Sequence, residues 1–141
     1  MAAQTCRNAI IRLIRSSGAA LVVSSFFAAG AAEASAPYCA PYQGSGYCQY
    51  TGRVVQAYIN SGNQIILYFD TPMNLADPAS VGISGVTVGN AASYNMSANV
   101  EFGKALYASL LAAQARGATI IVQMWGVSGG YLQIDRIWVN E

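Results

Sequence analysis

The sequence has 141 residues, 54% of them hydrophobic and 9% charged, with a formal net charge of +1. It contains no histidine, which excludes catalytic sites of the Ser-His-Asp and Cys-His types. Three of its seven basic residues, Arg7, Arg12 and Arg15, lie close to the N-terminus. The rest of the chain therefore has no basic cluster of the kind that binds nucleic acid, and we expect none to be bound.

Residues 1–34 have the features of a secretory signal peptide. The three arginines precede an apolar run at 19–32, and small residues at Ala32, Ala34 and Ala36 provide sites for a signal peptidase. We expect cleavage after Ala34, with cleavage after Ala36 as the alternative, and a secreted or periplasmic product. Because the apolar run is short for an anchor, no membrane span is expected after processing.

Residues 35–141 have a length that suits a single domain. Cys39 and Cys48 are expected to form a disulfide in an oxidising compartment. Two cysteines without histidine cannot complete a tetrahedral zinc site, so neither a metal nor another cofactor is predicted. The segment 35–51 is rich in Tyr, Pro, Gly and Ser without apolar periodicity. It is predicted to be an irregular, disulfide-stapled lead, followed by the folded domain at 52–141.

Regular structure is predicted to begin with a β-hairpin. Residues 53–59 and 64–70 are rich in β-branched and aromatic residues, and the Asn- and Gly-rich residues between them suit a tight turn. Pro72 ends the second strand, and a loop is predicted from there to residue 79. A short strand interrupted by glycines is expected at 81–88. The pattern at 90–97 fits either an extended continuation of that strand or a loop.

A single helix is predicted at 99–116. Asn99 is a suitable N-cap, and Glu101 lies in the first turn, where the helix dipole favours an acid. Gly117 supplies a left-handed stop. The apolar stripe of this helix is formed by Phe102, Leu106, Leu110 and Ala113, and is widened by Leu111.

Two further strands are predicted at 118–125 and 131–139, joined by a glycine-rich turn at 126–130. The resulting order is strand, strand, strand, helix, strand, strand. This order predicts a mainly β protein with one helix (α+β), in the layout of a five-stranded OB-type barrel.

The last of these strands changes its parity midway. Leu132 and Ile134 share one face by alternation. Ile137 and Val139 share the opposite face. A β-bulge near Asp135 would direct all four apolar side chains into the core.

The C-terminal part of the chain resembles a known group of proteins. Residues 102–120 read FGKALYASLLAAQARGATI, and residues 131–139 read YLQIDRIWV. This pattern is similar to that of small secreted bacterial proteins, mostly of unknown function, which resemble the OB-fold B subunits of pentameric toxins. Because such B subunits bind cell-surface glycans and form rings, the resemblance implies glycan recognition and a homo-oligomer. It assigns no receptor-binding residue to a position in this sequence.

Nine tyrosines and two tryptophans make the chain rich in rings that suit stacking on sugars or packing at protein interfaces. The candidate aromatics whose strand parity places them away from the core are Tyr58, Tyr68, Trp125 and Trp138. Asp70 and Asp77 are interpreted as residues that end a strand and start a turn, so no catalytic residue is predicted and the protein is not expected to be an enzyme.

These patterns lead to the hypothesis of a secreted, non-enzymatic binding protein that recognises a glycan or a protein receptor and assembles into a ring. The alternative is a structural or assembly-only envelope protein whose aromatic residues are buried between copies. A hydrolase that uses carboxylates alone is a third interpretation, and it would depend on Asp70 and Asp77.

Overall fold

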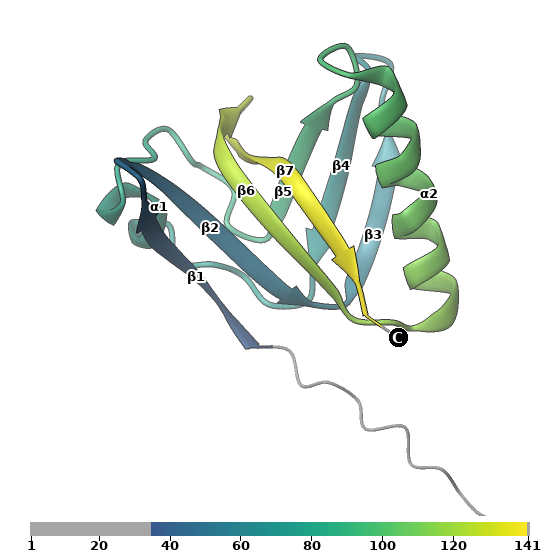
Figure 1. Cartoon of the computed structure of the whole chain (residues 1–141), viewed down its shortest axis with the longest axis horizontal. Coiled ribbons are helices and arrows are strands. Elements are labelled where there is room, and N and C mark those ends of the chain that lie inside the picture. Colours follow the sequence, from purple (N-terminus) through teal and green to yellow (C-terminus); the bar gives the residue numbers. More distant parts are fainter. Residues whose placement is uncertain (1–34, 141) are drawn as a thin grey trace, which may run out of the picture.

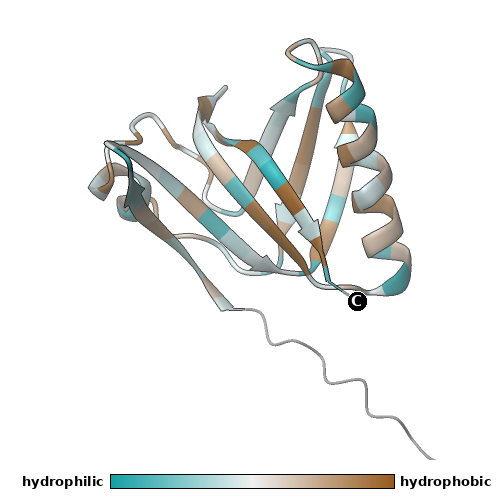
Figure 2. Cartoon of the chain, viewed as in Figure 1, coloured by the Kyte–Doolittle hydropathy of each residue, from teal (hydrophilic) through white to brown (hydrophobic). Residues whose placement is uncertain are grey.

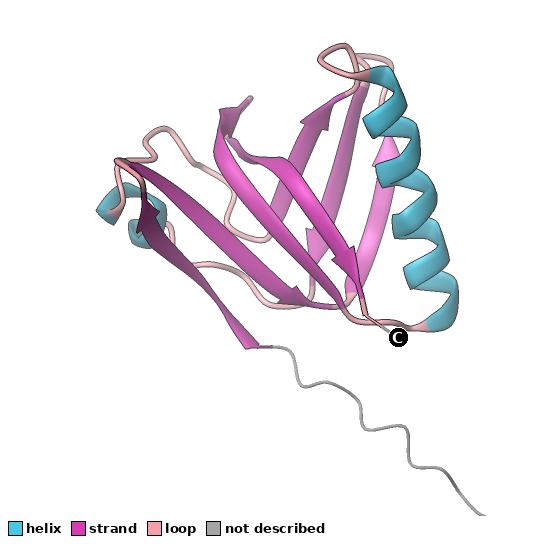
Figure 3. Ribbon diagram, in the orientation of Figure 1, coloured by secondary structure: helices cyan, strands magenta, loops and turns pink. Residues whose placement is uncertain are grey.

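Seven β-strands and two helices form the part of the chain that this computed structural model describes, residues 35–140 (Figure 1 and Figure 3). The signal peptide predicted at 1–34 lies outside the described residues. Within residues 35–140, no helix is long and apolar enough to cross a membrane. In chain order the elements are β1 (Ser35–Tyr42), β2 (Ser45–Gly52), β3 (Val54–Ile59), β4 (Gln64–Phe69), α1 (Ala76–Ser80), β5 (Ala91–Asn95), α2 (Val100–Arg116), β6 (Ile120–Ser128) and β7 (Tyr131–Val139).

The strands form one mixed sheet in the order β1-β2-β6-β7-β5-β4-β3. Neighbouring strands are antiparallel, except that β5 and β7 run parallel. The mainly β class is confirmed, but the predicted count of five strands and one helix is wrong. The sheet of the described residues is open, with β1 and β3 outermost, and so differs from the closed barrel that the sequence predicts.

The segment 35–51 is a β-hairpin, not the irregular lead that its composition predicts. Gln43 and Gly44 connect β1 to β2 with φ angles of 48° and 81°, as in a type I′ turn. The predicted disulfide is confirmed, and it joins Cys39 to Cys48 directly across the hairpin, with Cα atoms 4.0 Å apart. Because β2 also pairs with β6, this hairpin is an integral part of the sheet.

A buried tyrosine fixes the junction between β2 and β3, which Arg53 alone separates. Tyr50 is fully buried and stacks on Phe69, with ring centroids 3.8 Å apart. Its hydroxyl donates to the carboxylate of Asp70 and lies 2.9 Å from the carbonyl oxygen of Arg53. A Cβ at position 52 would lie 2.2 Å from this hydroxyl, so Gly52 leaves the room that the tyrosine needs.

The β-hairpin predicted at 53–70 is confirmed as β3 and β4. Its turn is organised by Asn60, whose side-chain oxygen accepts hydrogen bonds from the backbone N–H groups of Gly62 and Gln64 at 2.9 and 3.1 Å. Asn63 adopts a left-handed φ of 57°, which asparagine tolerates better than most residues. The turn chemistry read from the sequence is therefore the chemistry that the hairpin uses.

The segment between β4 and β5 departs from the prediction in two places. The short helix α1 replaces part of the loop predicted up to residue 79, and its Pro78 is buried. Residues 81–88 form no strand, although Ile83 within them is buried in the core. The strand that follows β4 is β5 instead, and it lies within the segment 90–97.

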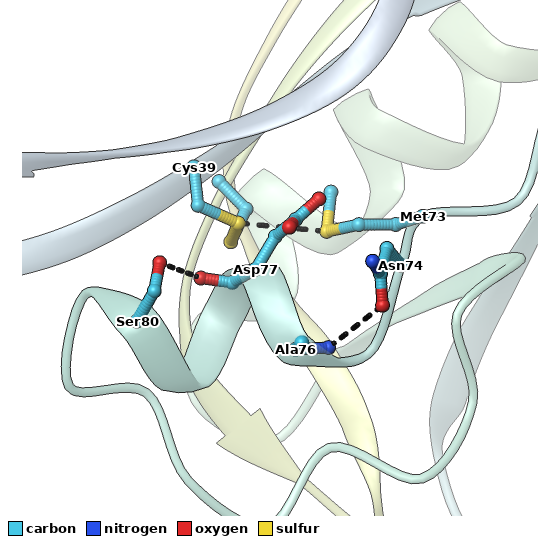
Figure 4. The surroundings of a disulfide bond; sticks show 7 residues. Cys39, Met73, Asn74, Ala76, Asp77 and Ser80 are labelled. Atoms are coloured by element: carbon cyan, nitrogen blue, oxygen red, sulfur yellow. Dashed lines mark hydrogen bonds between the residues drawn. A yellow bond between two sulfur atoms is a disulfide. The ribbon is translucent and has the colours of Figure 1, made fainter.

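The disulfide also packs against the segment that carries α1 (Figure 4). The Sγ atom of Cys39 lies 3.6 Å from the Sδ atom of Met73. This is a van der Waals contact, because a disulfide sulfur has no proton to donate. The side-chain oxygen of Asn74 accepts from the N–H of Ala76 at 3.1 Å and so shapes the entry into the helix. The disulfide thus provides a packing surface in addition to a covalent link.

The predicted long helix is confirmed as α2. The side-chain oxygen of Asn99 accepts from the N–H of Phe102 at 3.0 Å, and Gly117 ends the helix with a φ of 63°. Leu111 is 43% exposed, so it does not widen the buried stripe as predicted. The buried residues of the helix are Gly103, Leu106, Leu110 and Ala113.

The β-bulge predicted near Asp135 is confirmed. Gln123 pairs with Arg136, whereas the next residue of β6, Met124, pairs with Ile134, so β7 has one extra residue at Asp135. Figure 2 shows the alternation of hydrophobic and hydrophilic residues along β7. On either side of the bulge, the apolar residues Leu132, Ile134, Ile137 and Val139 all pack in or against the core.

A second irregularity, in β6, involves Trp125 and Gly126. The register of β6 and β7 shifts between Met124 and Val127, and Gly126 has a φ of 74°. The strand therefore continues to Ser128, and the turn consists of two glycines at 129–130 rather than the predicted 126–130.

One apolar core lies between the curled sheet and α2. Fully buried side chains come from strands far apart in the sheet order, such as Tyr50 of β2 and Leu67 of β4, and they belong to one core cluster, so the sheet curls around this core. The opposite side of β1, β2, β6 and β7 points away from the core, and we call it the outer face. The largest fully buried side chains include Tyr50, Ile65, Leu67, Leu106, Leu110, Ile120, Met124 and Leu132.

Candidate functional site

The four candidate aromatics form two groups, and only Tyr68 and Trp125 lie next to fully buried residues of their strands. Trp125 of β6 and Trp138 of β7 lie on the outer face. Trp138 is 43% exposed, whereas Trp125 is half-buried. Tyr58 and Tyr68 lie on β3 and β4, at the other end of the sheet order.

The tyrosine group has three members. Tyr58 and Tyr68 stack with ring centroids 6.4 Å apart and planes inclined by 17°. A hydrogen bond with Tyr68 raises the pKa of Tyr131, at the start of β7. We call Tyr58, Tyr68 and Tyr131 the tyrosine row. It belongs to the β3–β4 hairpin and the β6–β7 turn.

Trp125 is the centre of the second group of rings. Tyr47 of β2 stacks on it, with centroids 5.5 Å apart and planes inclined by 22°. Tyr42 meets Trp125 edge-on at 5.9 Å, and Tyr38 meets Tyr47 edge-on at 6.3 Å. A hydrogen bond with Tyr47 raises the pKa of Tyr38. We call Tyr38, Tyr42, Tyr47 and Trp125 the ring cluster.

Arg136 of β7 lies over the ring cluster. Its guanidinium carbon is 6.0 Å from the centroid of the Trp125 ring, within the range of a cation–π interaction. Its backbone pairs with Gln123 of β6, the residue two positions before Trp125. The side chain is exposed and forms an ion pair with its neighbour Asp135 at 3.0 Å. The guanidinium of Arg136 therefore lies near the Trp125 ring at an exposed position of the outer face.

Trp138 forms one wall of a depression on the same face, with a volume of about 250 Å³. Three carboxamide side chains surround it, those of Gln49 from β2, Gln123 from β6 and Asn140 after β7, and Ile121 adds an apolar side chain. Each carboxamide offers both hydrogen-bond donors and an acceptor. This Trp138 depression thus combines an exposed indole with neutral polar groups.

Two polar atoms of β6 are buried without a hydrogen-bond partner in the described structure, Oε1 of Gln123 and Nε1 of Trp125. The Nε2 group of Gln123 donates to Oε1 of Gln49 at 3.2 Å, so the other end of that carboxamide is the unpaired one. A buried polar group without a partner costs roughly 1–3 kcal/mol. One orphaned acceptor and one orphaned donor therefore lie on neighbouring side chains of the same strand face.

A second cavity, of about 290 Å³, lies between the β1–β2 turn, the loop after α1 and the bulge of β6. Its wall offers backbone groups, small side chains and three aliphatic side chains, and no titratable side chain lines it. The lining residues are Gly44, Ser45, Gly46, Val81, Gly82, Ile83, Ser84, Gly126 and Val127.

The carboxylates considered for hydrolysis have other partners or positions. Asp70 accepts hydrogen bonds from the hydroxyls of Tyr50 and Thr71, while Asp77 lies in α1. Burial, followed by the hydrogen bond to Asp70, raises the pKa of Tyr50 well above its ordinary value. Among residues 35–140, no three His, Cys, Asp or Glu side chains gather where they could hold a metal ion together.

Sequence reasoning missed most of this face because it treated the segment 35–51 as irregular. Tyr38, Tyr42, Tyr47 and Gln49 all come from that segment. A signal was present, since Gly46, Cys48, Tyr50 and Gly52 of β2 alternate with more polar residues and are buried. The buried row contains no Val, Ile or Leu, so its alternation was not recognised as that of a β-strand.

No protein-family model, curated protein or solved structure matches this chain. The chemistry of the outer face is therefore interpreted from its residues and their geometry.

Proposed function

We propose that the protein is a secreted, non-enzymatic protein that binds carbohydrate in the Trp138 depression. The observation that carries this proposal is an indole, 43% exposed, beside three carboxamides in a depression of about 250 Å³. Sugars have an apolar C–H face that stacks on an aromatic ring and a rim of hydroxyls that both donate and accept hydrogen bonds. Gln49, Gln123 and Asn140 match such a rim because each offers both functions.

The ligand class follows from what this depression lacks as well as from what it has. None of its five lining side chains carries a charge, so a purely ionic ligand has no counter-charge among them. A fully apolar ligand would leave the carboxamides without partners, at a cost in free energy. A neutral, hydroxyl-rich ring satisfies both the indole and the amides.

We further propose that the domain is a variant of the OB layout. Three features support this. β2 and β3, separated by Arg53, would together be the first strand, pairing with β6 through one half and with β4 through the other. β4, β5, β6 and β7 would be the other four strands, with α2 between the third and the fourth. On this proposal, β1 is an addition to the barrel, and the likeness to toxin B subunits concerns residues 45–139.

Assembly of several copies is part of the proposal. Of the two outermost strands, β1 and β3, β3 is the better candidate for pairing with another copy. β1 contains Pro37 and Pro41, which cannot donate hydrogen bonds and so discourage pairing with another chain. β3 contains neither proline nor charge, and its Val55 and Ile59 are 58% and 41% exposed. Gln114 of α2 occupies the carbonyl of Val55 at 3.1 Å, but this covers one group of the edge.

A glycan array combined with native mass spectrometry tests the proposal. We expect a defined set of glycans to bind and a ring of copies to be the main species. Trp138→Ala should weaken glycan binding at least tenfold, because it removes the stacking surface. Tyr58→Ala, a change in the tyrosine row, serves as the matched control and should leave binding unchanged. A monomer that binds no glycan on the array would contradict both parts.

The same variants address the assembly-only alternative, which the exposed apolar edge of β3 favours. If Trp138→Ala abolished the ring and no glycan bound the native protein, Trp138 would be an interface residue and the structural role would replace the binding role. If Trp138→Ala removed ligand binding and left the ring intact, the carbohydrate site would stand.

A further inference from the structure

The Trp138 depression belongs to a larger surface, because two of its residues lie in a row of side chains that crosses four strands. Gln49 of β2 pairs with Tyr38 of β1 on one side and with Gln123 of β6 on the other. Gln123 pairs in turn with Arg136 of β7. Directly opposed residues of antiparallel strands point to the same face, with Cβ atoms about 4.5–5.5 Å apart. Since Gln49 and Gln123 alternate with buried residues, the whole row lies on the outer face.

Two aromatic rings of equal exposure flank the carboxamides of this row. Trp138 on β7 and Tyr38 on β1 are both 43% exposed. Between them, Nε2 of Gln123 donates to Oε1 of Gln49 at 3.2 Å, so the two amides form a joined floor. β1 and β7 are separated by three strand spacings, which is about 14 Å along the sheet. The outer face therefore presents two aromatic walls with an amide floor between them.

This distance exceeds the length of one sugar ring. A pyranose residue extends a chain by roughly 5 Å, because it is built from bonds of about 1.5 Å. About three linked residues therefore cover the distance from Trp138 to Tyr38. The depression has a volume of about 250 Å³, below the range of about 300–1,000 Å³ that is usual for pockets that enclose a ligand. It thus has room for part of such a chain, and the rest lies on the neighbouring surface.

We infer that the ligand is an oligosaccharide of at least three residues that lies across the strands, with one residue on Trp138 and another on Tyr38. This inference rests on the proposed carbohydrate function, and it adds the length of the ligand and a second contact residue. The carboxamides of Gln49 and Gln123 face the hydroxyls of the residue between the two rings. The protein recognises a stretch of chain instead of a single sugar.

The β1–β2 hairpin holds Tyr38 in place beside the depression. In its register, the disulfide pair Cys39 and Cys48 directly follows the pair of Tyr38 and Gln49. The ring of Tyr38 also meets that of Tyr47 edge-on at 6.3 Å. A side chain that is ordered before binding loses less conformational entropy when a ligand stacks on it. The disulfide therefore pre-organises the second contact residue.

Tyr42 provides a matched control for Tyr38 on the same strand. It is 52% exposed and also belongs to the ring cluster. Its partner across the hairpin is Ser45, which does not line the Trp138 depression. It lies four residues from Tyr38, about 13 Å along β1. A chain that leaves the depression toward β1 reaches Tyr38 and not Tyr42.

The test measures affinity against chain length by isothermal titration calorimetry. The probes are β-1,4-linked oligomers of glucose, mannose, xylose and N-acetylglucosamine, each from the monosaccharide to the pentasaccharide. If none of these series binds, the strongest glycan of the array takes their place and is shortened one residue at a time. In the series that binds, we expect the affinity to rise at least tenfold up to the trisaccharide and then to level off.

The variants assign the length dependence to Tyr38. Tyr38→Ala should lower the affinity for the trisaccharide about tenfold, to that for the disaccharide, and leave the disaccharide unaffected. Tyr42→Ala should change neither value. Tyr38→Phe keeps the ring and should bind the trisaccharide as the native protein does. Trp138→Ala should weaken binding at every chain length.

The outcomes separate the inference from the proposed function. Affinity that is independent of chain length, or undiminished binding of the trisaccharide by Tyr38→Ala, would overturn the inference and leave carbohydrate binding in place. Equal losses in Tyr38→Ala and Tyr42→Ala would show a general disturbance of β1 and would overturn the role of Tyr38. If neither the oligomers nor any glycan on the array bound, the proposed function itself would fail.

Discussion

The two hairpins at the ends of the sheet order, β1–β2 and β3–β4, are held together in different ways. In β4, Ile65 and Leu67 are fully buried aliphatic residues, and a network around Asn60 organises the turn. In β1–β2, the buried residues are few and not aliphatic, and a disulfide joins the strands. The comparison suggests that the aliphatic hairpin is the main source of stability, whereas the stapled hairpin contributes the aromatic outer face.

The most direct way to test the aliphatic side of this comparison is Leu67→Ala. Leu67 is fully buried in the core, so the substitution should lower the free energy of unfolding by about 3 kcal/mol. Leu111→Ala on α2 is the matched control, and it should change stability by less than about 0.5 kcal/mol because that leucine is 43% exposed. Urea denaturation measures both values. Equal losses for the two leucines would show that Leu67 does not have the core position described.

The stapled side is tested by removing the disulfide with Cys39→Ala and Cys48→Ala together. The link closes a short loop, with a sequence separation of 9, and its loss should cost about 2–3 kcal/mol. Hydrogen exchange should accelerate in β1, β2 and the segment of Met73 that packs on the disulfide, while β3 and β4 stay protected. Uniform acceleration over the whole sheet would contradict the division between the two hairpins.

The same division explains which parts of the fold could be read from the sequence. The β3–β4 hairpin and α2 follow local rules, namely β-branched strands around a turn organised by Asn60 and Asn63, and a helix capped by Asn99 and Gly117. The bulge at Asp135 followed from the change of parity in β7. In each case, the sequence pattern and the burial of the side chains agree.

The remaining parts depend on contacts distant in sequence. β5 consists largely of small residues, and its Ala92 and Ser93 are buried because β4 and β7 pair with it on either side. The sequence 81–88 reads as a strand, but it has no strand partner and places Ile83 in the core as a loop. The candidate site was found only in part, because Trp125 and Trp138 were predicted without the ring partners that β1 and β2 supply.

Tyr50 connects the two hairpins, and its removal has a smaller effect that depends on pH. Tyr50→Phe deletes the hydrogen bond to Asp70 and should cost about 1 kcal/mol at neutral pH. The folded pKa of Tyr50 is raised above that of an unfolded tyrosine, which is about 10. The unfolded chain therefore loses this proton first as the pH rises, and the native protein should lose stability above pH 10.

Denaturation curves between pH 7 and pH 11 measure this effect as the difference between the native protein and Tyr50→Phe. Tyr38 and Tyr131, whose pKa values are also raised, are present in both proteins and cancel in that difference. The gap between the two proteins should narrow above pH 10. A constant gap over the whole range would show that the Tyr50 hydroxyl does not keep its proton in the folded state.

The two hairpins also differ at their outer edge strands, because β1 contains prolines and β3 does not. A substitution at the edge of β3 is expected to have the smallest effect on stability. Val55 of β3 is 58% exposed, so Val55→Lys should change the free energy of unfolding by less than about 0.5 kcal/mol. A lysine on an edge strand opposes pairing with another chain, so the same change should convert a ring of copies into monomers. Leu75→Lys, a change at a residue 45% exposed but outside both edge strands, is the matched control and should leave the ring intact. Native mass spectrometry distinguishes the two outcomes. Loss of the ring in both variants would indicate a general effect of charge, and persistence of the ring in Val55→Lys would move the contact away from β3.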